Sequence, residues 1–437
     1  MSADLAARYR EHLDVLGRGT AAVLAAHDLD ALVIAAGAPA LKSRFDDQHW
    51  PQIPTPTFAH WLPLPEPDAV LVIRPGARPH LIRVASDDYW ELPARAESDH
   101  FWDSFEVIEV KTAAGAADHL PRGRVAVIAP GDLPFAPPGP VNPPALVAAL
   151  EQLRTRKTPY EIACIAEASR RAVRGHKSAA ERFAASQLSE LGLHLDYLAA
   201  SDQDDADTPY KNIVARGSHA AVLHWVTYDR RPGGEPDSLL VDAGARYLGY
   251  ACDITRTWVR GAGAAADAFS ALVDGVDRLQ RRVCAEIRVG DAYEALHDRS
   301  HQLLAEVLVE IGLGRGAPST LVERGVTRAL FPHGLGHSLG LQVHDVGLRP
   351  RPPRPENRFL RNTSTIEAGQ VFTIEPGCYV IGALLAPLAD DDRKDLLDWR
   401  LLDALRPFGG VRIEDDVVVT VDGARNLTRE AWAETAA

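Results

Sequence analysis

The sequence has little sulfur: 437 residues contain four cysteines and one methionine. The cysteines are scattered along the chain and form no Cys-x-x-Cys pair. This scatter argues against a disulfide framework and against a zinc site built from thiolates. Any metal in this protein is therefore expected to be held by carboxylates and imidazoles. The four cysteines are Cys164, Cys252, Cys284 and Cys378.

The chain also lacks long apolar runs and an excess of basic residues. No apolar run approaches the roughly 20 residues that a membrane-spanning helix needs. The amino terminus carries alternating charges where a signal peptide would have an apolar core. Lys and Arg number 47 against 60 Asp and Glu, for a net charge of −13 and a pI near 5.7. Such a chain is predicted to bind neither nucleic acid nor membrane and to work in the cytoplasm.

What is present is an ordinary globular composition, 46% hydrophobic and 24% charged. At roughly 100–200 residues per domain, the length predicts two or three domains. A helix is expected to open the chain, and Pro75-Gly76 marks a hairpin between two of the strands that follow. Residues 1–154 are thus predicted to form a small α/β domain. Its five strand-length apolar stretches are 31–37, 69–76, 80–84, 105–110 and 124–131.

Seven prolines between Pro130 and Pro144 argue against regular structure there. We place the domain border after them, at 154/155, although a long surface loop within one domain is an alternative. Thr158 and Glu161 form a capping box that predicts a helix start. Further helices are expected at 187–200, 265–288 and 292–312, the last capped by Asp291. Together with strands of period two, they predict an α+β domain with a largely antiparallel sheet over 155–437.

Four acids lie inside apolar strand segments of this second domain. A buried, unpaired carboxylate is costly and is normally neutralised or bound to a metal. Asp242 ends the run SLLV, and Asp253 follows after a turn through Gly249, so a hairpin could place the two carboxylates side by side. Glu375 lies in VFTIEPG, and Glu414 lies in GGVRIED. Each acid alone is typical of a turn cap or of a solvated face, and only their combination indicates a site.

Three histidines, His333, His337 and His344, lie in FPHGLGHSLGLQVHD among glycines that let the backbone approach a site closely. Four carboxylates with one imidazole balance the charge of two divalent metals. Oxygen-rich ligation favours Mn²⁺, and zinc or cobalt would also bind. Two metals roughly 3.5–4 Å apart activate a shared water molecule at neutral pH. The pattern therefore predicts a hydrolase.

These motifs, in this order, resemble those of the pita-bread metallopeptidases, and among them most of all those of the prolidases (Xaa-Pro dipeptidases). The bacterial prolidases that resemble organophosphorus acid anhydrolase are the nearest in pattern. The resemblance implies a pita-bread catalytic domain that hydrolyses Xaa-Pro dipeptides and releases free proline, and it suggests a side activity on organophosphorus triesters. The motifs are HGLGHSLGLQVHDVG, FTIEPG, LRPFGGVRIED, NLTRE, DTPYKNIVA, AAVLHW and, more faintly, RFDDQHWP.

The resemblance also implies the metal ligands. Asp253 and Glu414 match the ligands that bridge the two metals, and Glu375 matches the ligand that also shuttles protons. The full set of implied metal ligands is Asp242, Asp253, His337, Glu375 and Glu414.

Other residues are implied to handle the substrate. His224 and His344 match histidines that hold the substrate and stabilise the tetrahedral intermediate. Arg361, fourteen residues before Glu375, resembles a clamp for the carboxylate of a C-terminal proline, because a guanidinium binds a carboxylate with two hydrogen bonds. Alternatively, Arg361 is one more arginine of the basic stretch at 349–361. Tyr210 is implied to be a pocket wall, His333 to bind substrate or support the site, and Asp47 to reach the site of the partner subunit in a homodimer.

Two other functions remain open. Aminopeptidase P removes the residue before proline from longer peptides and has the same metal ligands. A pita-bread domain can also be a peptide-binding module without catalysis, but such modules have lost ligands, and all five positions are filled here.

Overall fold

The structure is a computed structural model that describes residues 3–85, 101–185, 188–234 and 237–435. It divides into two units, Met1–Cys164 and Ile165–Ala437. The predicted border at 154/155 lies before the helix α4 (Pro159–Ala185), whereas this division falls within its first turns.

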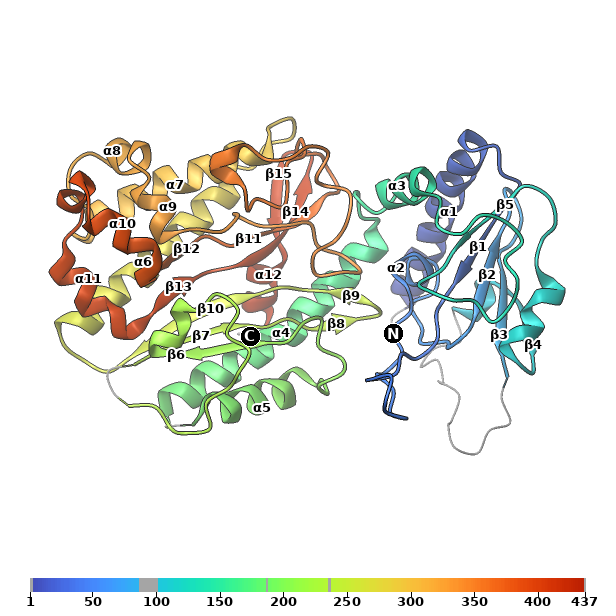
Figure 1. Cartoon of the computed structure of the whole chain (residues 1–437), viewed down its shortest axis with the longest axis horizontal. Coiled ribbons are helices and arrows are strands. Elements are labelled where there is room, and N and C mark those ends of the chain that lie inside the picture. The colour runs from blue at the N-terminus through green and yellow to red at the C-terminus, as the bar shows by residue number, and fades with distance from the viewer. Residues whose placement is uncertain (1–2, 86–100, 186–187, 235–236, 436–437) are drawn as a thin grey trace. The chain divides into compact units, whose positions relative to one another are not determined.

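The first unit contains a five-stranded sheet in the order β4-β3-β2-β1-β5 (Figure 1). β2 and β3 form an antiparallel hairpin across Pro75-Gly76, as predicted, and Gly76 adopts the positive φ of 72° that this turn requires. β1 pairs in parallel with β5, so the unit has the expected α/β character. The strands are β1 (Ala31–Ala35), β2 (Val70–Ile73), β3 (His80–Val84), β4 (Glu106–Val110) and β5 (Val125–Ile128).

Helices of the first unit are α1 (Ala3–Ala26), the short α2 (Pro56–Ala59) and α3 (Pro144–Gln152). The proline-rich stretch contains no helix and no extended strand before α3, as predicted, but α3 itself was not predicted. Pro144 occupies its first turn, where a proline costs no hydrogen bond. The capping box at the start of α4 is confirmed, because the Thr158 amide donates to the Glu161 carboxylate at 2.8 Å.

The second unit consists of antiparallel sheets covered by helices (Figure 1). α4 and α5 (Glu190–Ser201) pack on β6 (Ile213–Arg216) and β7 (Asp237–Asp242) through a buried cluster that includes Phe183, Tyr197 and Leu239. β7 pairs with β10 (Thr255–Arg260). α6 (Ala264–Ala285) and α7 (Tyr293–Glu310) share a second core with β11 (Val371–Ile374) and β14 (Asp415–Thr420). The predicted cap of α7 was wrong: Ala292 occupies the cap position, and no side chain caps this helix.

Short pairings join these parts. β8 (Arg246–Tyr247) and β9 (Tyr250–Ala251) form the hairpin between Asp242 and Asp253, and β12 (Gly377–Tyr379) pairs with β13 (Gly410–Arg412). A single antiparallel bridge between Thr255 and Glu414 links the β7–β10 sheet to the strands of the second core. The remaining elements are α8 (Pro318–Glu323), α9 (Val326–Leu330), α10 (Gly382–Ala389), α11 (Trp399–Leu405), β15 (Gly423–Asn426) and α12 (Leu427–Glu434).

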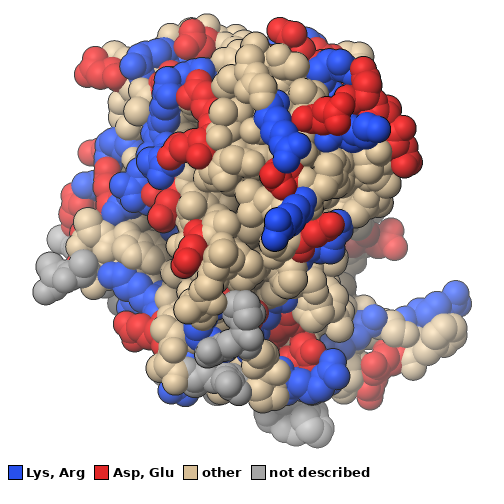
Figure 2. All heavy atoms as spheres, turned by 90° about the vertical axis from the view of Figure 1, so that its left-hand side faces the viewer, with Lys and Arg blue, Asp and Glu red and all other residues tan. Residues whose placement is uncertain are grey.

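Charges of both signs are mixed on the face of the molecule drawn in Figure 2. Exposed ion pairs such as Arg278–Glu310, at 2.7 Å, and Arg324–Asp392, at 2.6 Å, place acids and arginines of the surface next to each other. Among the helices that the structure describes, none is long and apolar enough to span a bilayer.

Candidate metal centre

The five residues predicted to bind metals lie together where the sheets of the second unit meet. Asp253, His337 and Glu414 are buried, and one ligand atom from each lies within 4.8 Å of the others. Nε2 of His337 lies 3.4 Å from Asp253 Oδ2, 3.7 Å from Glu375 Oε1 and 3.9 Å from Glu414 Oε1. Asp242 joins the group through Tyr210, whose hydroxyl lies 2.8 Å from Asp242 Oδ1 and also contacts Asp253 Oδ1.

The backbone brings these side chains together from distant parts of the chain. Asp242 ends β7, and its neighbour across the ladder is Thr255, two residues beyond Asp253. His337 pairs with β11, because its amide donates to Thr373 Oγ1 at 3.1 Å and its carbonyl accepts from the Thr373 amide at 2.9 Å. Gly336 permits this approach, since a Cβ atom there would lie 2.0 Å from the Thr373 carbonyl oxygen.

Burial and mutual repulsion favour protonation of the carboxylates. Burial, reinforced by the charge of Asp242, raises the pKa of Asp253 well above its ordinary value. Burial and the charge of Asp253 do the same to the pKa of Glu414. Burial raises the pKa of Glu375 to about 7, and this rise is opposed by His337 when its imidazole is protonated and by the Arg412 guanidinium.

Divalent cations fit this set of donors. A cation among the carboxylates would oppose both the burial penalty and the repulsion between them. Burial also lowers the pKa of His337, which keeps its imidazole neutral and able to bind a metal. The residues that could hold metal ions are therefore Asp242, Asp253, His337, Glu375 and Glu414.

The predicted substrate residues lie around this cluster with different exposure. His224 and Arg361 are exposed, and the ring of His344 contacts that of His337 at 4.4 Å between centroids. The charge of Arg361 contributes to the lowered pKa of His337, so the guanidinium lies near the cluster. His333 lies 3.6 Å from Glu375 Oε2 and accepts a hydrogen bond from the Tyr379 hydroxyl at 2.8 Å.

Asp47 belongs to the first unit. It lies in an exposed loop and accepts a hydrogen bond from Gln48 at 3.2 Å. Its predicted role in the site of a partner subunit stays a prediction.

Arg412 and Tyr379 contact the cluster, and neither was predicted from the sequence. Arg412 is buried and donates to Asp242 Oδ2 at 2.5 Å and to the Tyr379 hydroxyl at 3.0 Å. Arg412 could have been found, because it lies two residues before Glu414 and so shares its face of an extended chain. Its cation offsets part of the negative charge of the cluster.

Glu190 is a third supporting residue that was not predicted from the sequence. Its buried carboxylate accepts hydrogen bonds from the Arg216 amide at 2.8 Å, His219 Nδ1 at 2.7 Å, Trp225 Nε1 at 2.8 Å and the Asp229 amide at 2.7 Å. One side chain thus organises the segment that carries His224. Its sequence context, at the start of a helix, gives no sign of these partners.

A second group of possible ligands lies in the first unit and consists of His12, His60 and Glu161. Its hydrogen bonds are already formed: His12 Nδ1 lies 2.9 Å from Thr158 Oγ1, and Nε2 lies 2.8 Å from the His60 carbonyl oxygen. We therefore assign this group to the start of α4, where it supports the capping box.

Comparison with known proteins supports the same interpretation. The family described as metallopeptidase family M24 matches residues 163–421, and the family described as Xaa-Pro dipeptidase, N-terminal domain, matches residues 7–151. A protein of Marinobacter nauticus named Xaa-Pro dipeptidase is 44% identical over 412 residues, which cover 93% of this chain and 94% of the relative. A protein of the same name from Xanthomonas axonopodis pv. citri is 39% identical over 444 residues, with 98% of each chain covered.

Solved structures of aminopeptidase P share the fold. Zinc-substituted Escherichia coli aminopeptidase P has a TM-score of 0.72 at 23% identity and covers 96% of this chain and 97% of its own. Pseudomonas aeruginosa aminopeptidase PepP has a TM-score of 0.73 at 24% identity, with 98% of each chain covered. The predicted pita-bread fold is confirmed by these neighbours together with the family matches.

Proposed function

Because this chain belongs to metallopeptidase family M24, we propose that it is a metal-dependent dipeptidase that hydrolyses Xaa-Pro dipeptides and releases free proline. The observation that carries the proposal is the near full-length similarity, at 36–44% identity, to proteins named Xaa-Pro dipeptidase. The amino-terminal match to the same class of enzyme supports it.

We assign two divalent cations to Asp242, Asp253, His337, Glu375 and Glu414, with Mn²⁺ favoured because oxygen donors outnumber nitrogen. Zinc and cobalt are the alternatives. Bound there, such ions would polarise the scissile carbonyl and lower the pKa of an attacking water molecule.

We assign to Glu375 the transfer of the proton that the attacking water molecule releases. Its carboxylate lies beside His337 in the cluster, where it could accept a proton from the attacking water and deliver it to the leaving imide nitrogen. His224 and His344 are assigned to the oxygen that becomes negatively charged during the attack. Tyr210 supports the two aspartates, and His333 supports Glu375 and the substrate pocket.

Arg361 is assigned to the terminal carboxylate of the substrate. It is exposed and lies near His337, so its guanidinium is available to a ligand that reaches the cluster. A fixed cation at this position would favour a substrate that ends at proline and would disfavour the longer peptides that aminopeptidase P cleaves.

We also propose a homodimer in the cytoplasm, with Asp47 reaching the site of the partner subunit. The loop around Asp47 supports an interface, because it exposes the large apolar side chains of Leu41, Phe45, Trp50 and Ile53. Hydrolysis of organophosphorus triesters stays a prediction from the resemblance.

Arg361→Met tests the dipeptidase assignment. A charged hydrogen-bonded contact is worth about 1.5–3 kcal/mol, so we expect kcat/KM for Ala-Pro to fall roughly 10- to 100-fold, with the metal content unchanged. Ala-Pro amide, which lacks the carboxylate, should be a poor substrate for both proteins and lose little on substitution. Arg358→Met is the matched control, since Arg358 is exposed and its guanidinium lies over the ring of Phe359. Equal losses for both substrates would contradict the clamp.

A further inference from the structure

Two short segments of the second unit carry the acids that we propose to bridge the metals. One runs from Asp253 to Arg256 and the other from Glu414 to Asp416. Thr255 Oγ1 donates to Glu414 Oε2 at 2.7 Å, and the Asp253 amide donates to the Asp416 carboxylate at 3.1 Å. Each ligand is therefore held by the residue two positions beyond the other ligand.

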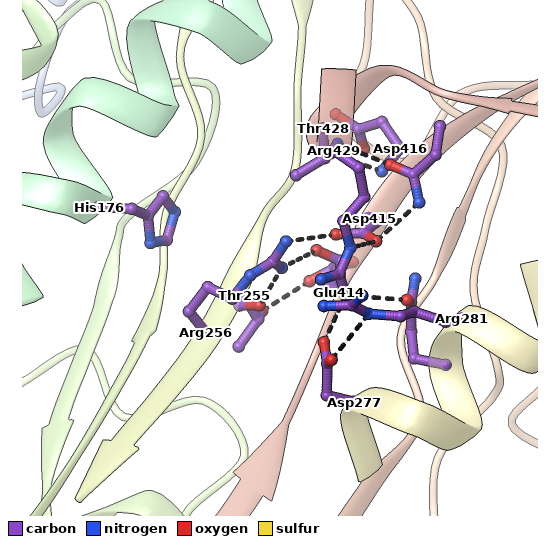
Figure 3. A network of polar contacts seen from close by, with 12 residues as sticks. His176, Thr255, Arg256, Asp277, Arg281, Glu414, Asp415, Asp416, Thr428 and Arg429 are labelled. Carbon is purple, nitrogen blue, oxygen red and sulfur yellow. Dashed lines mark hydrogen bonds and ion pairs between the residues drawn. The ribbon is translucent and has the colours of Figure 1, made fainter. Parts of the chain in front are cut away.

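Arg256 fastens these two segments together (Figure 3). Its Nη1 donates to the carbonyl oxygens of Thr255 and Glu414, both at 2.8 Å, and its Nη2 donates to Asp415 Oδ1 at 2.6 Å. One guanidinium thus binds the main chain of both segments and a carboxylate. The side chain is buried, so these contacts are shielded from water.

Asp415 anchors the arrangement to the surrounding helices. It is fully buried, and its Oδ2 accepts hydrogen bonds from Asn426 Nδ2 and Arg429 Nε, both at 2.7 Å. Arg429 in turn donates to Asp277 of α6 at 2.5 Å, a link also seen in Figure 3. The Thr255–Glu414 bridge is therefore supported by two ion pairs, Arg256–Asp415 and Arg429–Asp277.

The ion pair lies on the side of the chain away from the proposed metals. Successive side chains of an extended segment point to opposite faces, so Arg256 and Asp415 point away from the face on which Thr255 contacts the Glu414 carboxylate. The ring of Trp432 in α12, 4.8 Å from the Arg256 guanidinium carbon, lies on that rear side. Neither charged group is placed to touch a substrate.

We propose that the Arg256–Asp415 ion pair is a positioning device that fixes the separation of Asp253 and Glu414 and thereby the affinity for the pair of metals. This inference rests on the proposed function only in taking these two acids as metal ligands. Groups that orient metal ligands from behind commonly change metal affinity 10- to 100-fold when they are altered. Arg256 is suited to this task, since the planar fork of its guanidinium donates to three oxygens on the two segments at once.

Arg256→Lys tests the proposal, because lysine keeps the positive charge but lacks the planar, forked set of donors of a guanidinium. We expect the apparent Kd for Mn²⁺, measured by calorimetric titration of the metal-free chain, to rise about 10- to 100-fold. At saturating Mn²⁺, kcat should recover and KM for Ala-Pro should stay within about twofold of the unaltered enzyme. Asp415→Asn keeps the shape of the side chain and removes its charge, and it should also raise the Kd for Mn²⁺. This variant provides the test if Arg256→Lys does not fold.

A buried arginine–aspartate pair away from the cluster provides the control. Arg216 Nε donates to Asp237 Oδ2 at 2.8 Å, and both side chains are buried. Arg216→Lys and Arg256→Lys should both lower the melting temperature, but Arg216→Lys should leave the Kd for Mn²⁺ within about twofold. Unchanged Mn²⁺ affinity in Arg256→Lys and Asp415→Asn, or an equal loss in Arg216→Lys, would overturn the positioning role.

The same titration separates this inference from the proposed function. If the unaltered chain binds Mn²⁺ tightly, Arg256→Lys binds it weakly and neither hydrolyses Ala-Pro, the dipeptidase proposal fails and the positioning role stands. If the unaltered chain hydrolyses Ala-Pro and Arg256→Lys matches its Mn²⁺ affinity, the positioning role fails and the dipeptidase proposal stands.

Discussion

Loading the centre with metal is predicted to expel protons. With a pKa of about 7, Glu375 carries a proton in roughly half of the metal-free molecules at pH 7. Burial and mutual repulsion raise the pKa values of Asp253 and Glu414 well above the ordinary range, which favours the protonated form of these two acids as well. A ligand must lose its proton to bind a metal. We therefore expect at least about half a proton to leave each chain on loading at pH 7, with any further release coming from Asp253 and Glu414.

Calorimetry of the metal-free chain measures this number directly. Titrations with Mn²⁺ in two buffers that differ in ionisation enthalpy give the number of protons released from the difference in heat. Each released proton should also strengthen the apparent affinity about tenfold per pH unit, so binding is tighter at pH 7.5 than at pH 6.5. Glu375→Gln should release roughly half a proton fewer at pH 7. Heats that are independent of the buffer, or an affinity that does not change with pH, would refute the reasoning.

Three further predictions concern support of the fold and the site. Glu190→Gln removes one acceptor oxygen from a side chain that receives four hydrogen bonds. We therefore expect the free energy of unfolding in urea to fall by about 1–3 kcal/mol and kcat/KM to fall roughly 10- to 100-fold. Unaltered kinetics would show that the His224 segment does not depend on Glu190. Gly336→Ala places a Cβ atom 2.0 Å from the Thr373 carbonyl oxygen. We expect this variant to bind less metal, measured by elemental analysis, and to melt at a lower temperature. Full metal content would contradict the need for this close approach. Burial lowers the pKa of His297 to about 4 in the folded chain, whereas in the unfolded chain it has its ordinary value of about 6.5. The unfolded chain therefore takes up a proton at a higher pH than the folded chain. As a result, the free energy of unfolding decreases as the pH falls from about 6.5 towards 4. At pH 5 this loss is about 2 kcal/mol relative to pH 8; His297→Gln should remove it from the urea-unfolding free energy, and an unchanged pH dependence would exclude His297 as its source.

The residues of the cluster were predictable because their chemistry contradicts their surroundings. An acid in an apolar strand, such as Glu375 or Asp242, is a weak signal alone, but the four acids and the glycine-flanked histidines together indicate a site. The hairpin between Asp242 and Asp253 also followed from the turn residues between them. Local sequence carries these signals, whereas the choice of His337 among the three histidines came from the resemblance to the pita-bread metallopeptidases.

The supporting residues were not predictable because their partners come from distant segments. The buried contacts of Glu190 lie with residues 26 to 39 positions later in the chain. Nothing near Arg256 indicates that its guanidinium binds the Glu414 carbonyl, 158 residues away. The predicted Asp291 cap failed for a related reason, since the chain enters α7 through Ala292, which forms a bridge with Thr365.

The choice of substrate tests the central claim most directly. We would measure kcat/KM of the Mn²⁺-loaded chain for Leu-Pro and for Leu-Pro-Gly under the same conditions. A dipeptidase with a carboxylate clamp at Arg361 should prefer Leu-Pro by at least about tenfold, the value of one charged contact. Equal or better hydrolysis of Leu-Pro-Gly would contradict the account and assign the chain to the activity of aminopeptidase P.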